Sequence, residues 1–166
     1  MNGFNWSRFS VRINIRSQPD TLYRAWVTKP GLEHWFLRDT IFISKDGRIR
    51  EKDEPIEAGD SYTWYWHGWP DETREVGEIL STNHTDALSF RFGKAGICTV
   101  RIYSYQDEQV VELVQHDIPT GDEEKVNWHL GCKTGWTFYL ANLKSLLEGG
   151  IDLRNKDLGM GETLNK

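Results

Sequence analysis

The five histidines of this 166-residue chain are the side chains best suited to acid–base or metal chemistry near neutral pH. They are His34, His67, His84, His116 and His129. No two of them have the four-residue spacing of a zinc site on a helix. His67 and His116 end expected strands and could approach Glu78 or Asp117, but spacing alone does not bring these groups together. We therefore expect no metal, no cofactor and no assigned catalytic residue.

The two cysteines, Cys98 and Cys132, are not spaced like a metal site. Cys98 falls in a strand pattern and Cys132 on an expected helix, so both are interpreted as reduced packing residues. No serine or cysteine stands in a nucleophile-elbow pattern, and no glycine-rich loop resembles a phosphate cradle. The sequence thus favours a binding protein over an enzyme.

Polar and aromatic side chains on inward strand faces are the better candidates for ligand contact, because most small-molecule pockets are apolar with a few polar anchors. Residues 62–69 form a strand rich in aromatic rings. Inward rings would line or fill a cavity, whereas outward rings would form an exposed ridge typical of a partner interface. The alternative that polar residues such as Arg101 face water stays open. The expected ligand-binding residues are Trp26, Tyr62, Trp64, Trp66, Arg101, Tyr103, Leu113, Gln115, Trp128, Cys132 and Tyr139.

The elements that must position these side chains follow from periodicity. Residues 8–16 alternate as a half-buried strand, and Pro19 then begins a short helix that Pro30 and Gly31 separate from a second one. Short strands punctuated by Asn, Asp and Gly follow from 39 to 116, which is typical of an antiparallel meander. A long helix presents its apolar side chains, from Trp128 to Leu147, in an arc of roughly 120°.

Three segments carry a family resemblance. They read AWVTKPGLxxWF over 25–36, GEI over 77–79 and GWxxYLxxLKxxLExG over 135–150. Together they resemble the START-like, or helix-grip (SRPBCC), superfamily, in the branch named for similarity to the C-terminal domain of the activator of the heat-shock protein 90 ATPase. The resemblance covers about residues 8–154. It implies an α+β fold in which a curved antiparallel sheet wraps around a long C-terminal helix, with two short helices after the first strand.

The resemblance also implies a cavity between sheet and long helix, since superfamily members bind lipids, hormones or polyketides and some act as cyclases or hydroxylase subunits. The favoured function is binding of a small apolar or aromatic molecule in that cavity. A cyclase- or dehydratase-like enzyme using the same pocket and a co-chaperone-like interaction module are the alternatives. The aromatic strand and Phe138, which lies outside the apolar arc, make a homodimer a further alternative.

Composition limits the remaining classes. The formal charge of −5 and the lack of a dense Lys/Arg cluster argue against nucleic acid. The first residues show no basic-then-apolar leader, and no apolar run approaches the ~20 residues that span a bilayer. We expect a cytoplasmic protein with one domain over 1–154 and a flexible tail over 155–166.

Overall fold

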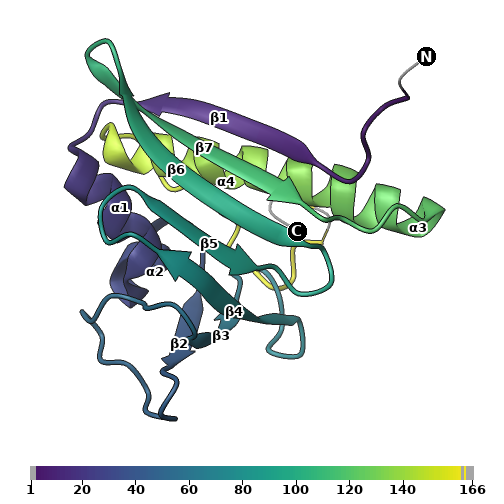
Figure 1. Cartoon of the computed structure of the whole chain (residues 1–166), viewed down its shortest axis with the longest axis horizontal. Coiled ribbons are helices and arrows are strands. Elements are labelled where there is room, and N and C mark those ends of the chain that lie inside the picture. Colours follow the sequence, from purple (N-terminus) through teal and green to yellow (C-terminus); the bar gives the residue numbers. More distant parts are fainter. Residues whose placement is uncertain (1–2, 162, 164–166) are drawn as a thin grey trace.

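The computed structural model describes residues 3–161 and 163. Seven strands form one antiparallel sheet in the order β1-β7-β6-β5-β4-β3-β2, and Figure 1 shows its curvature. The strands are β1 (Phe9–Ile15), β2 (Asp39–Ile43), β3 (Ser61–Tyr65), β4 (Arg74–Thr82), β5 (Ala87–Arg91), β6 (Ile97–Tyr105) and β7 (Glu108–His116). The helical elements are α1 (Pro19–Val27), α2 (Lys29–Trp35), α3 (Asp122–Glu124), η1 (Lys125–Leu130) and α4 (Gly131–Leu147).

The long helix α4 covers one face of the sheet, and α1 and α2 lie at one end of it (Figure 1). One contiguous core joins the inner sheet face, α1, α2 and α4. The order of elements and the position of α4 confirm the α+β prediction. The first and last strands of the chain are neighbours in the sheet, because β7 pairs with β1.

The break between α1 and α2 follows the predicted chemistry. Thr28 is the N-cap of α2, and its side-chain oxygen accepts a hydrogen bond from the Gly31 amide at 3.1 Å. The same hydroxyl donates to the carbonyl oxygen of Arg24 at 2.9 Å. A Cβ on Gly31 would overlap this Arg24 oxygen. Glycine at position 31 therefore allows the two short helices to pack closely.

The entrance to the long helix differs from the sequence prediction. Residues 125–130 form a π-helix, and the Gly131 amide donates to the carbonyl of Val126, five residues back. The wider turn shifts the phase of the side chains, so His129 is buried while Trp128 is only half-buried. His129 Nδ1 lies 2.8 Å from the Trp6 carbonyl oxygen. Phe138, expected to be exposed, is also half-buried and packs against the core.

The segment after α4 returns to hold the end of α2. The buried Arg154 guanidinium donates to three backbone carbonyls there, those of Glu33 and Leu37 at 3.0 Å and of His34 at 2.8 Å. Its charge pairs with Asp152 at 2.7 Å. Since the last carbonyls of a helix lack partners within the helix, Arg154 satisfies acceptors that would otherwise be buried without a donor.

Candidate functional site

A pocket of about 460 Å³ lies between the first turns of α4 and the neighbouring end of the sheet. Aromatic rings from α4, the end of α2 and two strand ends form most of its wall. The lining residues are Phe36, Trp66, Trp69, Phe92, Asn127, Leu130, Gly131, Cys132, Thr134, Gly135, Trp136 and Tyr139. Three neutral polar side chains are among them, and no Lys or Arg from the described part of the chain lines the pocket.

The aromatic strand points inward, which resolves the alternative left open by the sequence. Tyr62 and Trp64 are buried on the inner face of β3, with ring centroids 4.0 Å apart and nearly parallel planes. They fill the deep part of the space between sheet and helix. Trp66, two residues further on, is half-buried and lines the pocket. The open volume therefore lies toward the end of the sheet and does not extend through the core.

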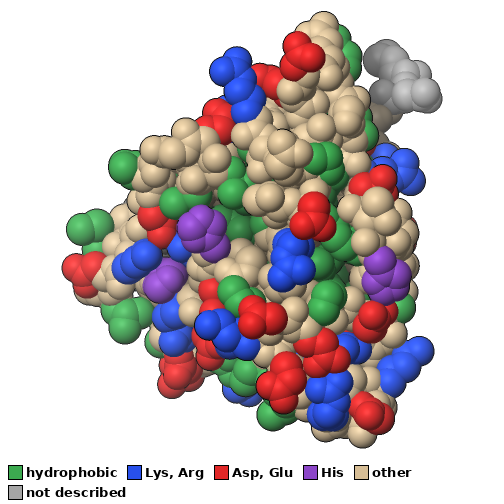
Figure 2. Space-filling view, turned by 90° about the vertical axis from the view of Figure 1, so that its left-hand side faces the viewer, with side chains coloured by type: hydrophobic (Ala, Val, Ile, Leu, Met, Phe, Trp, Pro, Cys, Tyr) green, Lys and Arg blue, Asp and Glu red, His purple; other side chains and the backbone are tan. Residues whose placement is uncertain are grey.

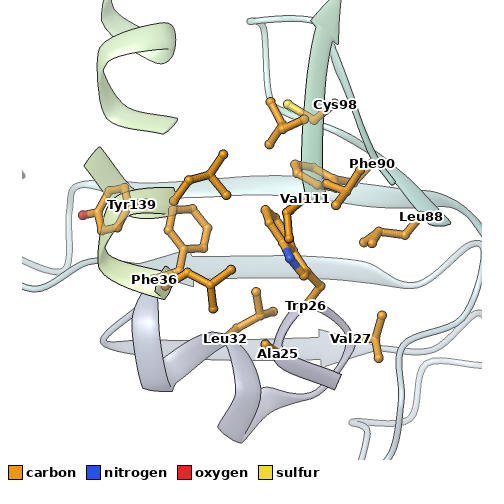
Figure 3. Packing of buried hydrophobic residues seen from close by; sticks show 14 of the residues in the cluster. Ala25, Trp26, Val27, Leu32, Phe36, Leu88, Phe90, Cys98, Val111 and Tyr139 are labelled. Atoms are coloured by element: carbon orange, nitrogen blue, oxygen red, sulfur yellow. The ribbon is translucent and has the colours of Figure 1, made fainter. Parts of the chain in front are cut away.

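Phe36 is the centre of the aromatic wall. It makes ring contacts with Trp66 and Tyr139 at 5.8 and 4.9 Å between centroids, and with Trp136 at 5.0 Å. Figure 3 shows Phe36 lying between Tyr139 of α4 and the core around Trp26. Because Phe36 follows α2 directly, the position of that short helix sets one side of the pocket.

Two glycines, Gly131 and Gly135, make the helix side of the pocket flat. They stand one turn apart, so they share a helix face. A Cβ on Gly135 would meet no atom within 4 Å, and one on Gly131 would meet only the Val126 carbonyl oxygen, at 3.6 Å. Packing therefore does not require glycine at either position, although each glycine costs about 1 kcal/mol of helix stability relative to alanine. Their effect is to leave space in the pocket.

Gln115 is the buried polar centre beneath the pocket. Its Oε1 accepts a hydrogen bond from Trp136 Nε1 at 3.0 Å, and its Nε2 donates to the Ala95 carbonyl oxygen at 2.8 Å. The Cys98 thiol also donates to Oε1, at 3.5 Å. Gln115 thus fixes the ring of Trp136, a lining residue, through a buried bond between sheet and helix.

The thiols of Cys98 and Cys132, beside Gln115, are held in the protonated form. Burial raises the pKa of Cys98 well above that of a free thiol, and burial likewise raises the pKa of Cys132. A thiolate is the reactive form of cysteine, so neither side chain is activated as a nucleophile. This agrees with their interpretation as packing residues.

The structure brings some of the predicted ligand-binding residues to one place. Trp66, Cys132 and Tyr139 line the pocket. Five others are buried in the core beneath it or beside it, and Trp128 is half-buried against the core without lining the pocket. The five core residues are Trp26, Tyr62, Trp64, Leu113 and Gln115.

The interpretation that Arg101 and Tyr103 face inward is wrong. On β6 the buried side chains are Cys98, Val100 and Ile102, so the alternate residues Arg101 and Tyr103 lie exposed on the outer face. The sequence showed the alternation but not its sign, since both faces of this strand carry ring or branched side chains. The orientation of β6 is set by the packing of Cys98, Val100 and Ile102 against the core.

Several lining residues were not predicted as ligand contacts. Trp69 and Phe92 lie in the connections after their strands, Phe36 follows α2, and Trp136 lies in the second turn of α4. The i, i+4 glycine pair on an otherwise apolar helix was the one available signal for the pocket wall. The loop residues gave none, because their positions depend on how the strands end.

None of the five histidines is among the described residues that line the pocket. His84 and His116 approach the carboxylates of Glu57 and Asp117 at 3.4 and 3.2 Å. Burial, together with the charges of Arg154 and Lys156, lowers the pKa of His67 to about 4. Within residues 3–161 and 163, no three His, Cys, Asp or Glu side chains gather as a metal-binding group.

A family model described as "Activator of Hsp90 ATPase homolog 1-like protein" matches residues 16–148. The chain belongs to this family. The match spans the two short helices, the sheet from β2 onward and the whole of α4, which are the elements that build the pocket. No curated protein matches the chain.

Solved structures similar to this family member share its fold. The Aha1 dimer of Colwellia psychrerythraea is 16% identical, with a TM-score of 0.65 and coverage of 86% of this chain and 97% of that one. An HSP90 activator of Plasmodium falciparum is 16% identical, with a TM-score of 0.60 and coverages of 86% and 96%. DynU16, a putative protein of the dynemicin biosynthetic locus, is 16% identical with a TM-score of 0.64, covering 86% of this chain but 47% of that one.

The surface of this family member carries charges of both signs. Figure 2 shows the end of the molecule at the left of Figure 1, where basic and acidic side chains are interspersed. No basic patch dominates this face. No helix in the described part of the chain is both long and apolar enough to cross a bilayer.

Proposed function

We propose that this AHSA1-family protein binds a small apolar or aromatic molecule in the pocket between α4 and the sheet. The observation that carries the proposal is the pairing of a glycine-lined helix wall with facing aromatic rings. A planar guest would rest against Gly131 and Gly135 and contact Phe36, Trp66 and Phe92. Concave, mostly aromatic pockets with a few polar groups are the usual form of small-molecule sites.

The size of the pocket suits one or two fused rings. A buried aromatic ring removes about 150 Å² of apolar area from water. At about 25 cal/mol per Å² this contributes about 4 kcal/mol, which corresponds to a dissociation constant of about 1 mM before the cost of association is subtracted. Rings alone therefore give weak binding, and a natural ligand needs a larger contact area or a polar anchor.

The test is titration of the protein with 2-methylnaphthalene, followed by NMR of the indole N–H signals. We expect shifts at Trp66, Trp69 and Trp136 and none at Trp6. Gly135→Leu places a side chain in the pocket and should abolish the shifts. The matched control is Thr137→Leu, an exposed position two residues along the same helix, and it should bind like the wild type. Unchanged binding by Gly135→Leu would overturn the proposal.

We also infer that the protein forms a homodimer, so that a second copy of the chain is its partner besides the small molecule. Its support is the solved dimer of Colwellia psychrerythraea, whose fold this chain shares. Light scattering should then give twice the 19.3 kDa mass of the chain. A mass of 19.3 kDa across the concentration range would exclude the dimer and leave the pocket proposal intact.

A further inference from the structure

Glu75 is a carboxylate on the inner face of the sheet, where nearly all other side chains are apolar. It pairs with Trp64 in the register of β3 and β4, and it alternates with Gly77 and the buried Ile79. Its strand runs between the strands that end in Trp66 and Phe92, two residues of the pocket wall. Glu75 therefore lies on the sheet between two pocket-lining rings, beside the pocket but not among the residues that line it.

This carboxylate has no cation among the described residues. Within residues 3–161 and 163 it accepts one hydrogen bond, from the Val76 amide to Oε1 at 3.2 Å, and takes part in no ion pair. The half-buried carboxylate of Asp152, by contrast, is paired with Arg154. Burial raises the pKa of Glu75, because the charged form loses solvation that the Val76 hydrogen bond only partly replaces.

The surrounding backbone is shaped around the carboxylate. Gly93, next to the lining residue Phe92, has φ +48°, and a Cβ there would overlap the Glu75 carboxylate. The charge also reaches the helix side of the pocket, since it contributes to the raised pKa of Cys132. No lysine or arginine of the described lining offsets it. Glu75 therefore places a negative charge beside a pocket whose described lining holds no cation.

We propose that Glu75 is the polar anchor of the pocket and selects aromatic ligands that carry a protonated amine. The proposal rests on the proposed function, because it assigns a ligand class to the same pocket. An ammonium group beside Glu75 would supply the missing counter-ion and a charge-assisted hydrogen bond. An aromatic carboxylate would instead bring a second negative charge into the same poorly solvated space. Specificity arises as much from this repulsion as from the attraction.

The experiment compares three probes that share one ring system. They are 2-naphthylmethylamine, which is cationic at pH 7, neutral 2-methylnaphthalene and anionic 2-naphthoate. We expect the wild type to bind the amine at least tenfold more tightly than the neutral probe, and the carboxylate most weakly. Glu75→Gln keeps the shape of the side chain and removes its charge, so it should bring the three affinities together.

The matched control is Glu78→Gln, which removes a charge from the exposed outer face of the same strand. It should keep the wild-type preference, which separates a local effect of Glu75 from a change in net charge. Thermal unfolding of both variants checks that they are folded, and Glu75→Gln should be no less stable than the wild type.

The outcomes distinguish the two proposals. If the neutral probe binds and the amine gains nothing over it, or if Glu75→Gln retains the preference, the assignment of Glu75 is overturned and the pocket proposal stands. If none of the three probes binds the wild type, the pocket proposal fails and the assignment fails with it. If the preference for the amine is lost in Glu75→Gln but kept in Glu78→Gln, the result supports both the pocket proposal and the assignment of Glu75.

Discussion

The ring of Tyr62 lies across the backbone of Gly77, its partner in the β3–β4 register, and reaches the next strand. Its hydroxyl donates to the carbonyl oxygen of Arg91 on β5 at 2.6 Å. A Cβ on Gly77 would overlap both the Tyr62 hydroxyl and that carbonyl oxygen. The absence of a side chain on β4 thus allows one ring of β3 to bridge three strands beneath the pocket.

Gly77→Ala should lower the free energy of unfolding by about 1–3 kcal/mol, because overpacking displaces the Tyr62 ring or the strand. Tyr62→Phe should cost about 1 kcal/mol, the net value of one hydrogen bond. Urea unfolding measures both. The exposed Tyr105→Phe should stay within about 0.5 kcal/mol of the wild type. An unchanged midpoint for Gly77→Ala would contradict this packing.

Two helical glycines should respond to alanine with opposite signs. Gly135→Ala adds a methyl group to open space and should raise the free energy of unfolding by about 0.5–1 kcal/mol. Gly31→Ala places the methyl group against the Arg24 carbonyl and should lower it by about 1–3 kcal/mol. Thermal unfolding of the two variants compares the same chemical change in both contexts. Equal shifts would show that pocket space does not explain Gly135.

Arg154 should be essential to stability although it follows the long helix and lies outside the family match. Arg154→Met leaves three carbonyls at the end of α2 without their donor and removes the buried cation that pairs with Asp152. The expected loss is about 3 kcal/mol, typical of breaking a buried charge pair. The control Lys156→Met removes an exposed partner of Asp152 and should cost less than about 1 kcal/mol. Chemical denaturation gives both values, and a loss below 1 kcal/mol for Arg154→Met would contradict the capping role.

His67 should make stability fall as the solution becomes acidic. Its pKa in the folded protein is about 4, against about 6.5 in an unfolded chain. Between these values the unfolded state binds the proton and the folded state does not, so stability decreases as pH falls from 6.5 toward 4. His67→Gln should flatten the dependence of the urea midpoint on pH in this window. Parallel profiles for the two proteins would show that His67 is not responsible.

Asp152 acts at lower pH. Partial burial opposes ionisation of its carboxyl, but hydrogen bonds from Arg154 and Lys156 outweigh this effect and hold its pKa well below the usual range. Its stabilisation is present above the pKa of an unfolded aspartate, about 3.9, and is lost as pH falls below that value. Asp152→Asn should therefore weaken the dependence of the urea midpoint on pH below pH 4, where Glu54 also contributes, while leaving the effect of His67 in place.

The sequence by itself determined the scaffold. Alternation in residues 8–16, the Pro-Gly break after the first helix and the amphipathic long helix are local patterns, and each fixes an element whatever its neighbours are. Their order leaves few ways to bury every apolar face, so the helix over a curved sheet could be predicted. The inward position of Gln115 could be predicted because this residue shares a strand face with the apolar Val111 and Leu113.

The tertiary structure alone decided where the space lies. Whether Tyr62 and Arg101 point in or out depends on which face of each strand meets α4, and period-two alternation leaves that sign open. The inward carboxylate of Glu75 and the lining ring of Trp69 are set by strand register and turn geometry. The π turn at residues 125–130 moved His129 inward. A pocket is the volume that packing fails to fill, so it is a property of all the contacts together and no local pattern encodes it.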